Sequence, residues 1–162
     1  YGGYLLKIAV NILADREDGR ESVNDTYLKA WESMPPHRPE VLRLYLAKIT
    51  RRTSIDIFRR KTRQKRGASQ YEESLSELSE CISGGDRTQE AVDSRLLAEA
   101  IGEWLRGLTP QQRGVFLSRY YFMDPIRDIG GYYGFSQSKV KSMLMRLRAD
   151  LKDRLEKEGF AV

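Results

Sequence analysis

Residues 128–148 read DIGGYYGFSQSKVKSMLMRLR, and this stretch decides the fold of the second half of the chain. Two helices cross steeply only where the crossing residue is very small and the turn accepts a positive φ, and Gly130 and Gly134 meet these two needs. Ser136 suits the N-cap of the second helix. The apolar residues that would wedge the two helices together are Ile129, Tyr133, Phe135, Val140 and Met143. The stretch therefore predicts a helix-turn-helix.

Helical periodicity divides the second helix of this motif into two faces. A stripe at about 100° per residue is apolar and predicts core. It holds Val140, Leu144, Leu147, Leu151 and Leu155. The opposite face carries Lys141, Ser142, Met145 and Arg146, whose cationic, hydroxyl and thioether groups suit base edges in a major groove. The alternative is a solvated helix face, but the glycines and the turn favour a surface that reads DNA.

Composition supports a polyanion as partner and gives no sign of catalysis. The chain has 162 residues and a net charge of +5, and lysine and arginine that neutralise phosphates release counterions. With one cysteine, Cys81, and one histidine, His37, neither an internal disulfide nor a thiol-rich zinc site can form. No phosphate-binding glycine loop, activated nucleophile or carboxylate pair stands out. We expect a protein that is not an enzyme and that needs no cofactor or metal.

The cellular location of the protein is predicted from its apolar runs and its cysteine content. No apolar run approaches the roughly 20 residues that span a bilayer, so we expect no membrane insertion. A single cysteine fits a reducing cytoplasm. The chain starts at Tyr1, without methionine and already inside helical sequence, which indicates a fragment of a longer protein.

The sequence predicts an all-α fold of two small helical domains. Helical periodicity recurs throughout, and the charge changes from basic to acidic after residue 66, which marks a boundary. We expect a bundle of three or more helices over residues 1–66 and a four-helix domain ending in the helix-turn-helix over residues 88–162. An acidic flexible linker, residues 67–87, would join them, with room for a short helix around Leu75 and Leu78.

The chain contains ILADRED at residues 12–18, VNDTYLKAW at residues 23–31 and YLAKITRRTSID at residues 45–56. Together with the helix-turn-helix, these stretches resemble the extracytoplasmic-function (ECF) sigma factors of bacterial RNA polymerase. ILADRED at residues 12–18 and VNDTYLKAW at residues 23–31 are similar to the part of the family's second region that docks on polymerase. YLAKITRRTSID at residues 45–56, running into FRRK, is similar to the part that melts and reads the minus-ten element. Leu108-Thr109-Pro110 and the helix-turn-helix resemble the fourth region, which reads the minus-thirty-five element.

The resemblance implies a function and a role for each surface. It implies a sigma factor that binds core RNA polymerase, directs initiation at promoter DNA and is controlled by an anti-sigma factor. The implied polymerase contacts are Asn24, Asp25, Tyr27, Leu28 and Trp31. The implied minus-ten contacts are Arg51, Arg52, Asp56, Arg59, Arg60 and Lys61. The implied minus-thirty-five contacts are Ser136, Gln137, Ser138, Lys139, Lys141, Ser142, Met145 and Arg146.

Other interpretations remain open at this point. A stand-alone helix-turn-helix regulator would bind operator DNA without polymerase. A DNA-binding accessory subunit of a DNA-processing enzyme would use its N-terminal bundle to hold the catalytic partner. For Asn24 and Asp25 the alternative is a solvated helix face. For Tyr27 and Trp31 it is the core of the bundle.

Overall fold

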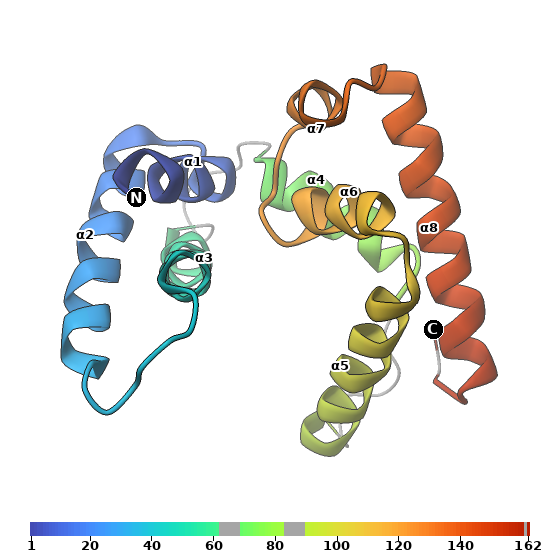
Figure 1. The fold of residues 1–162 in the computed structure, drawn as a ribbon, viewed down its shortest axis with the longest axis horizontal. Coiled ribbons are helices and arrows are strands. Elements are labelled where there is room, and N and C mark those ends of the chain that lie inside the picture. Colours follow the sequence, from blue (N-terminus) through green and yellow to red (C-terminus); the bar gives the residue numbers. More distant parts are fainter. Residues whose placement is uncertain (62–68, 83–89, 161) are drawn as a thin grey trace. The chain divides into compact units, whose positions relative to one another are not determined.

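The protein is all-α in the residues that the computed structural model describes (Figure 1). These are residues 1–61, 69–82, 90–160 and 162, and none of them forms a strand. The predicted fold class is confirmed. The chain forms two compact units. Unit 1 consists of Tyr1–Glu73 with Phe122–Asp124, and unit 2 of Ser74–Tyr121 with Pro125–Val162.

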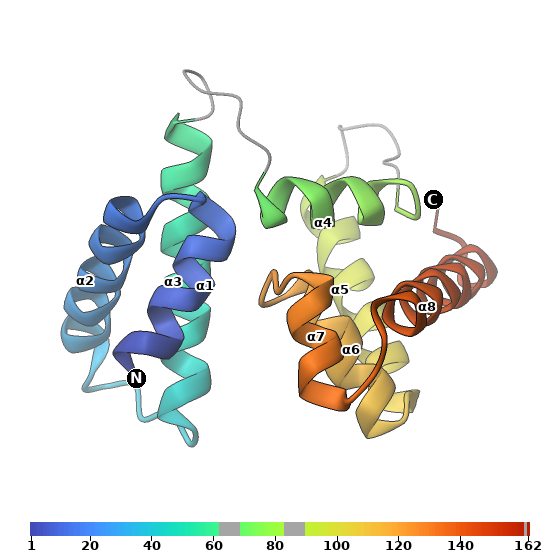
Figure 2. The same ribbon diagram turned by 90° about the horizontal axis from the view of Figure 1, so that it is seen from above.

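Three helices make up most of unit 1. They are α1 (Gly2–Leu13), α2 (Arg16–Ser33) and α3 (Leu42–Lys61), and each packs against the other two (Figure 2). Asp15 starts α2, because its carboxylate accepts hydrogen bonds from the backbone N–H groups of the first turn. A Cβ at Gly19 would come within 2.9 Å of the Val10 side chain, so glycine here lets α2 approach α1 closely.

A ladder of buried hydroxyl groups joins α2 to α3. Ser22 Oγ lies 2.7 Å from Ser54 Oγ, and Thr26 Oγ1 donates to Thr50 Oγ1 at 3.0 Å. All four side chains are fully buried. Buried hydroxyls need partners, so sliding α3 along α2 would leave several of them unpaired. The ladder therefore fixes which face of α3 points away from the bundle.

Among its described residues, unit 2 has four complete helices and most of a fifth. These are α5 (Glu90–Gly107), α6 (Pro110–Tyr120), α7 (Ile126–Tyr133), α8 (Gln137–Lys157) and residues from Ser74 onward of α4 (Gln70–Ser79). The predicted stripe on α8 is confirmed as core, since its five members are 5% exposed or less. Trp104 and Phe116 pack edge to face against one another in the same core, with ring centroids 4.9 Å apart.

The expected linker contains the short helix predicted around Leu75 and Leu78, but residues from Ser74 onward belong to unit 2 and are not a flexible tether. Ser69 begins α4 with reciprocal bonds: its Oγ accepts from Glu72 N at 3.2 Å, and Glu72 Oε2 accepts from Ser69 N at 3.0 Å. Further along the helix, Ser74 and Cys81 are buried. One acidic residue of the segment, Glu77, forms an ion pair with the buried Arg119 of the same unit. The predicted boundaries near residues 66 and 88 lie outside the described residues.

Candidate nucleic-acid interface

The turn between α7 and α8 has the local geometry that the sequence predicts (Figure 1). A Cβ at Gly130 would lie only 2.6 Å from the carbonyl oxygen of Phe135, so only glycine fits where α7 meets the turn. Gly134 ends α7 with φ of 67°, in the left-handed region that favours glycine. Ser136 Oγ accepts from Lys139 N at 3.1 Å and caps α8.

The eight predicted minus-thirty-five residues lie in or next to the first three turns of α8, and all of them are exposed. Met145 shows 59% of its surface although it is apolar. The ammonium group of Lys139 lies 3.9 Å from the centroid of the Phe135 ring, a cation–π contact that holds it beside the turn. The face is hydroxyl-rich and cationic, as a base-reading helix requires.

A hollow of about 370 Å³ lies at one side of this face. Five of its lining residues come from α8 and one, Gln112, comes from α6. The lining is Gln112, Lys139, Ser142, Met143, Arg146 and Leu147. The order Thr109-Pro110-Gln111-Gln112 is a local helix-capping signal, and nothing in it places Gln112 beside α8.

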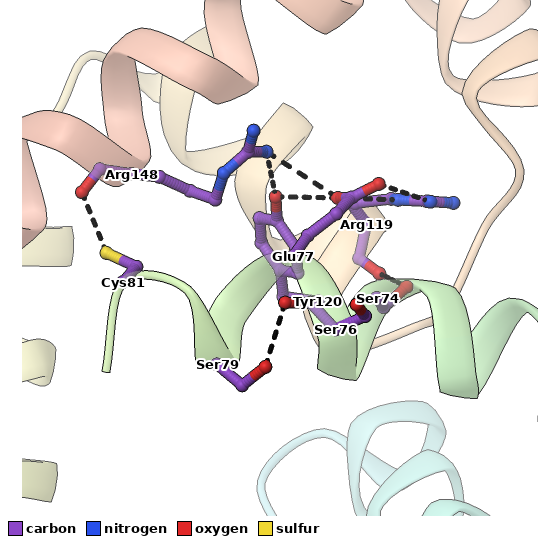
Figure 3. Close-up of polar contacts among 8 residues, drawn as sticks. All are labelled: Ser74, Ser76, Glu77, Ser79, Cys81, Arg119, Tyr120 and Arg148. Atoms are coloured by element: carbon purple, nitrogen blue, oxygen red, sulfur yellow. Dashed lines mark hydrogen bonds and ion pairs between the residues drawn. The ribbon is translucent and has the colours of Figure 1, made fainter. Parts of the chain in front are cut away.

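A polar network on another side of α8 ties that helix to α4 and α6. Figure 3 shows Glu77 of α4 facing Arg119 and Tyr120 of α6 and Arg148 of α8. Glu77 accepts from Arg119 Nη2 at 2.7 Å and from Tyr120 Oη at 2.9 Å. Arg148 donates to Tyr120 Oη at 2.6 Å, and its backbone oxygen accepts from Cys81 Sγ at 2.9 Å. Sequence reasoning placed none of these residues in a polar network.

Charges in this network keep Glu77 ionised. Burial alone would raise the pKa of Glu77, but hydrogen bonds from Arg119 and Tyr120, with the charges of Arg119 and Arg148, outweigh it, so the pKa lies below its ordinary value. Burial raises the pKa of Tyr120 well above its ordinary value, so the hydroxyl stays protonated and continues to donate. The network is thus a carboxylate held by two guanidinium groups and a phenol.

In unit 1, the predicted minus-ten residues do not all have the same surroundings. Arg52, Asp56, Arg59 and Arg60 are exposed on α3, while Arg51 is half-buried. Lys61 forms an ion pair with Asp18 of α2, and the hydrogen bond to that carboxylate raises the pKa of Lys61. The structure therefore brings Arg52, Asp56, Arg59 and Arg60 to one solvent-facing side, and it gives Lys61 a partner inside unit 1.

The predicted polymerase contacts lie mainly on one exposed strip of α2, which we call the α2 strip: Asn24, Tyr27, Leu28 and Trp31. Trp31 is 82% exposed, Leu28 62% and Tyr27 43%. Asp25 is half-buried beside the strip. The alternative that Tyr27 and Trp31 form the bundle core is wrong, because α2 buries Gly19, Ser22, Val23, Thr26 and Ala30 instead. Three adjacent exposed apolar side chains are typical of a docking surface.

The comparison with known families bears on unit 1, where α2 and α3 carry these two surfaces. Residues 1–64 match Sigma-70 region 2. The matched residues include α1, α2 and α3 completely. The match makes residues 1–64 similar to a region found in sigma factors. No curated protein matches the chain. Within the described residues, no helix combines the length and apolar character needed to cross a membrane.

Proposed function

We propose that this protein is an ECF-type sigma factor that binds core RNA polymerase and directs initiation at specific promoters. The observation that carries the proposal is that the Sigma-70 region 2 match covers a unit with an exposed apolar strip on α2 and an exposed basic face on α3. Unit 2 adds a second DNA-directed surface on α8. One chain then carries a surface that binds polymerase and surfaces that select the promoter.

Each surface has a physical task in this mechanism. The α2 strip docks on core polymerase by burying its apolar side chains. The basic face of α3, with Arg52 and Arg59, stabilises the separated minus-ten strands. Strand separation costs on the order of 1.4 kcal/mol per base-pair step, and capture of unpaired bases and backbone charge offsets it. Polymerase supplies the chemistry, and the protein works in the cytoplasm, where an anti-sigma factor would mask these surfaces.

The upstream duplex is read by α8 in this mechanism. Residues in the N-terminal turns of a recognition helix contact base edges in the major groove. Arg146 can form a bidentate contact with guanine, and Ser142 can donate to or accept from any base. Lys139, held beside the turn, is suited to a phosphate. The α8 face would thus combine sequence readout with backbone contacts.

Transcription from purified components tests the function. We expect the full chain to co-purify with core polymerase and to support initiation at a distinct set of promoters from a genomic fragment library. Specific DNA binding without any binding to core polymerase would instead support a stand-alone regulator. Binding to polymerase without promoter-dependent transcripts would contradict the sigma-factor proposal and support an accessory subunit.

Two substitutions on α8 test how promoter sequence is read. Arg146→Ala should weaken binding by about 1–3 kcal/mol and relax the preference at one upstream base pair, because a bidentate base contact is lost. Lys139→Ala should weaken binding to all duplexes about equally, since a phosphate contact carries no sequence information. Competition binding against a panel of single-base promoter variants measures both effects. Equal losses on every variant for both substitutions would refute the reader assignment of Arg146.

A further inference from the structure

The side chain of Gln112 is fixed at the start of α6 with one end engaged and the other end free to face a ligand. In the capping box, Gln112 N donates to Thr109 Oγ1 at 3.2 Å, and Gln112 Oε1 accepts from Thr109 N at 3.2 Å. A backbone N–H can only donate, so the atom that meets it must be the amide oxygen. The two hydrogens of Nε2 therefore point away from the cap.

The surroundings of Gln112 favour an anion. The hollow that it lines also receives Lys139, Ser142 and Arg146 from α8. These supply two cationic groups and a hydroxyl, and the described lining includes no carboxylate. A neutral amide that donates into such a hollow adds a directed hydrogen bond to a region of positive potential. The hollow is thus suited to an oxyanion that contacts α6 and α8 together.

We propose that Gln112 is a DNA-backbone ligand whose Nε2 donates to a phosphate oxygen bordering the groove that α8 reads. The inference rests on the proposed function, because it takes the duplex bound by α8 as the source of the phosphate. Elements flanking a recognition helix contact the backbone and fix its register on the duplex, whereas base edges are read by the recognition helix itself. Gln112 lies on α6, outside α8, which assigns it to the backbone. Gln112 would thus position α8 in the groove.

The substitution Gln112→Glu separates the proposed donation to a DNA phosphate from the role of Gln112 in capping α6. Glutamate retains the acceptor that caps Thr109 N, and it is an equally common partner in a capping box. An acid in the first turn also suits the helix dipole. The thermal midpoint of the variant should therefore match that of the parent. A carboxylate replaces the Nε2 donor, so affinity for duplex DNA should fall by about tenfold or more through lost donation and repulsion.

The matched control is Gln111→Glu. Gln111 is the exposed neighbour in the same turn, it is absent from the lining of the hollow, and the change adds the same charge. Both variants and the parent would be titrated at low salt with short duplexes of several unrelated sequences, since a phosphate contact acts on all of them. A loss for Gln112→Glu on every duplex, much larger than for Gln111→Glu, is the expected result.

Three outcomes would overturn the inference. Equal losses for the two variants would show only the effect of added charge. A loss confined to duplexes with one particular base pair would make Gln112 a base reader. If the parent itself binds no duplex, at low salt or with core polymerase present, the proposed function fails together with the inference. In the first two outcomes the proposed function stands and the role of Gln112 alone is wrong.

Discussion

Glu77→Ala is expected to lower the unfolding free energy of unit 2 by about 3 kcal/mol. Removing one partner of a buried ion pair typically costs about 3–5 kcal/mol, because the other charge stays buried without compensation. Arg119 is only 2% exposed and would be left in that state, while the 27% exposure of Glu77 places the expected loss at the lower end. Chemical denaturation of the full chain, followed by the fluorescence of buried Trp104, measures the change. A Trp31→Phe background makes Trp104 the sole tryptophan.

Glu80→Ala is the matched control for this loss, because Glu80 is an exposed acid just after α4. It should change the unfolding free energy by less than about 0.5 kcal/mol. Glu77→Gln should fall between the two, since glutamine can still accept a hydrogen bond from Arg119 but carries no charge. If Glu77→Ala costs no more than Glu80→Ala, the network does not hold α4 on unit 2, and the segment is a tether after all.

The same carboxylate predicts a pH dependence with a defined sign. The pKa of Glu77 is lower in the folded protein than its ordinary value of 4.5. Stability from this group is therefore fully present above pH 4.5 and is lost as the pH falls through the lower folded pKa. Denaturation curves collected across that acidic range should converge for the parent and Glu77→Gln, because the two carry the same charge at this position once Glu77 is protonated.

The elements that the sequence predicted best are those whose signals are local. Gly130, Gly134 and Ser136 each act within a few residues of their own position, through a close contact, a left-handed turn and a cap. The apolar stripe of α8 follows from periodicity alone. These features need no knowledge of the rest of the chain, so the α7–turn–α8 geometry could be predicted with its core face.

The features that the sequence missed depend on partners far along the chain. Glu77 lies 42 residues before Arg119, and no local sequence signal indicates the pair. The short helix around Leu75 and Leu78 was therefore expected within a linker and not as part of unit 2. The Ser22–Ser54 contact was not predicted, because the helical pattern was identified from apolar residues and serine is not one of them. Lys61 was predicted to contact DNA without its partner Asp18 in view. An aromatic such as Trp31 fits a core or a docking surface equally well until its exposure is known.

Trp31→Ala is expected to separate docking from folding. With 82% of its surface exposed, Trp31 contributes little to the bundle, so the unfolding free energy should change by less than about 0.5 kcal/mol. An exposed tryptophan in an apolar strip is a typical anchor of an interface, and truncating such an anchor costs about 2 kcal/mol or more. The affinity for core polymerase should therefore fall by about 30-fold or more, as measured by titration with labelled protein.

Leu96→Ala is the matched control for the effect of Trp31→Ala on polymerase affinity. Leu96 is another exposed apolar side chain, 51% accessible, but it belongs to α5 of unit 2 and not to the α2 strip. Its loss should leave both polymerase affinity and stability unchanged, so any difference between the variants belongs to the strip and not to exposed apolar surface in general. Trp31→Ala should also leave binding to free duplex DNA intact, because the faces that we propose for DNA lie on α3 and α8. Unchanged polymerase affinity in a folded Trp31→Ala protein would exclude the α2 strip as the docking surface, and the holoenzyme would then have to form through another face of unit 1.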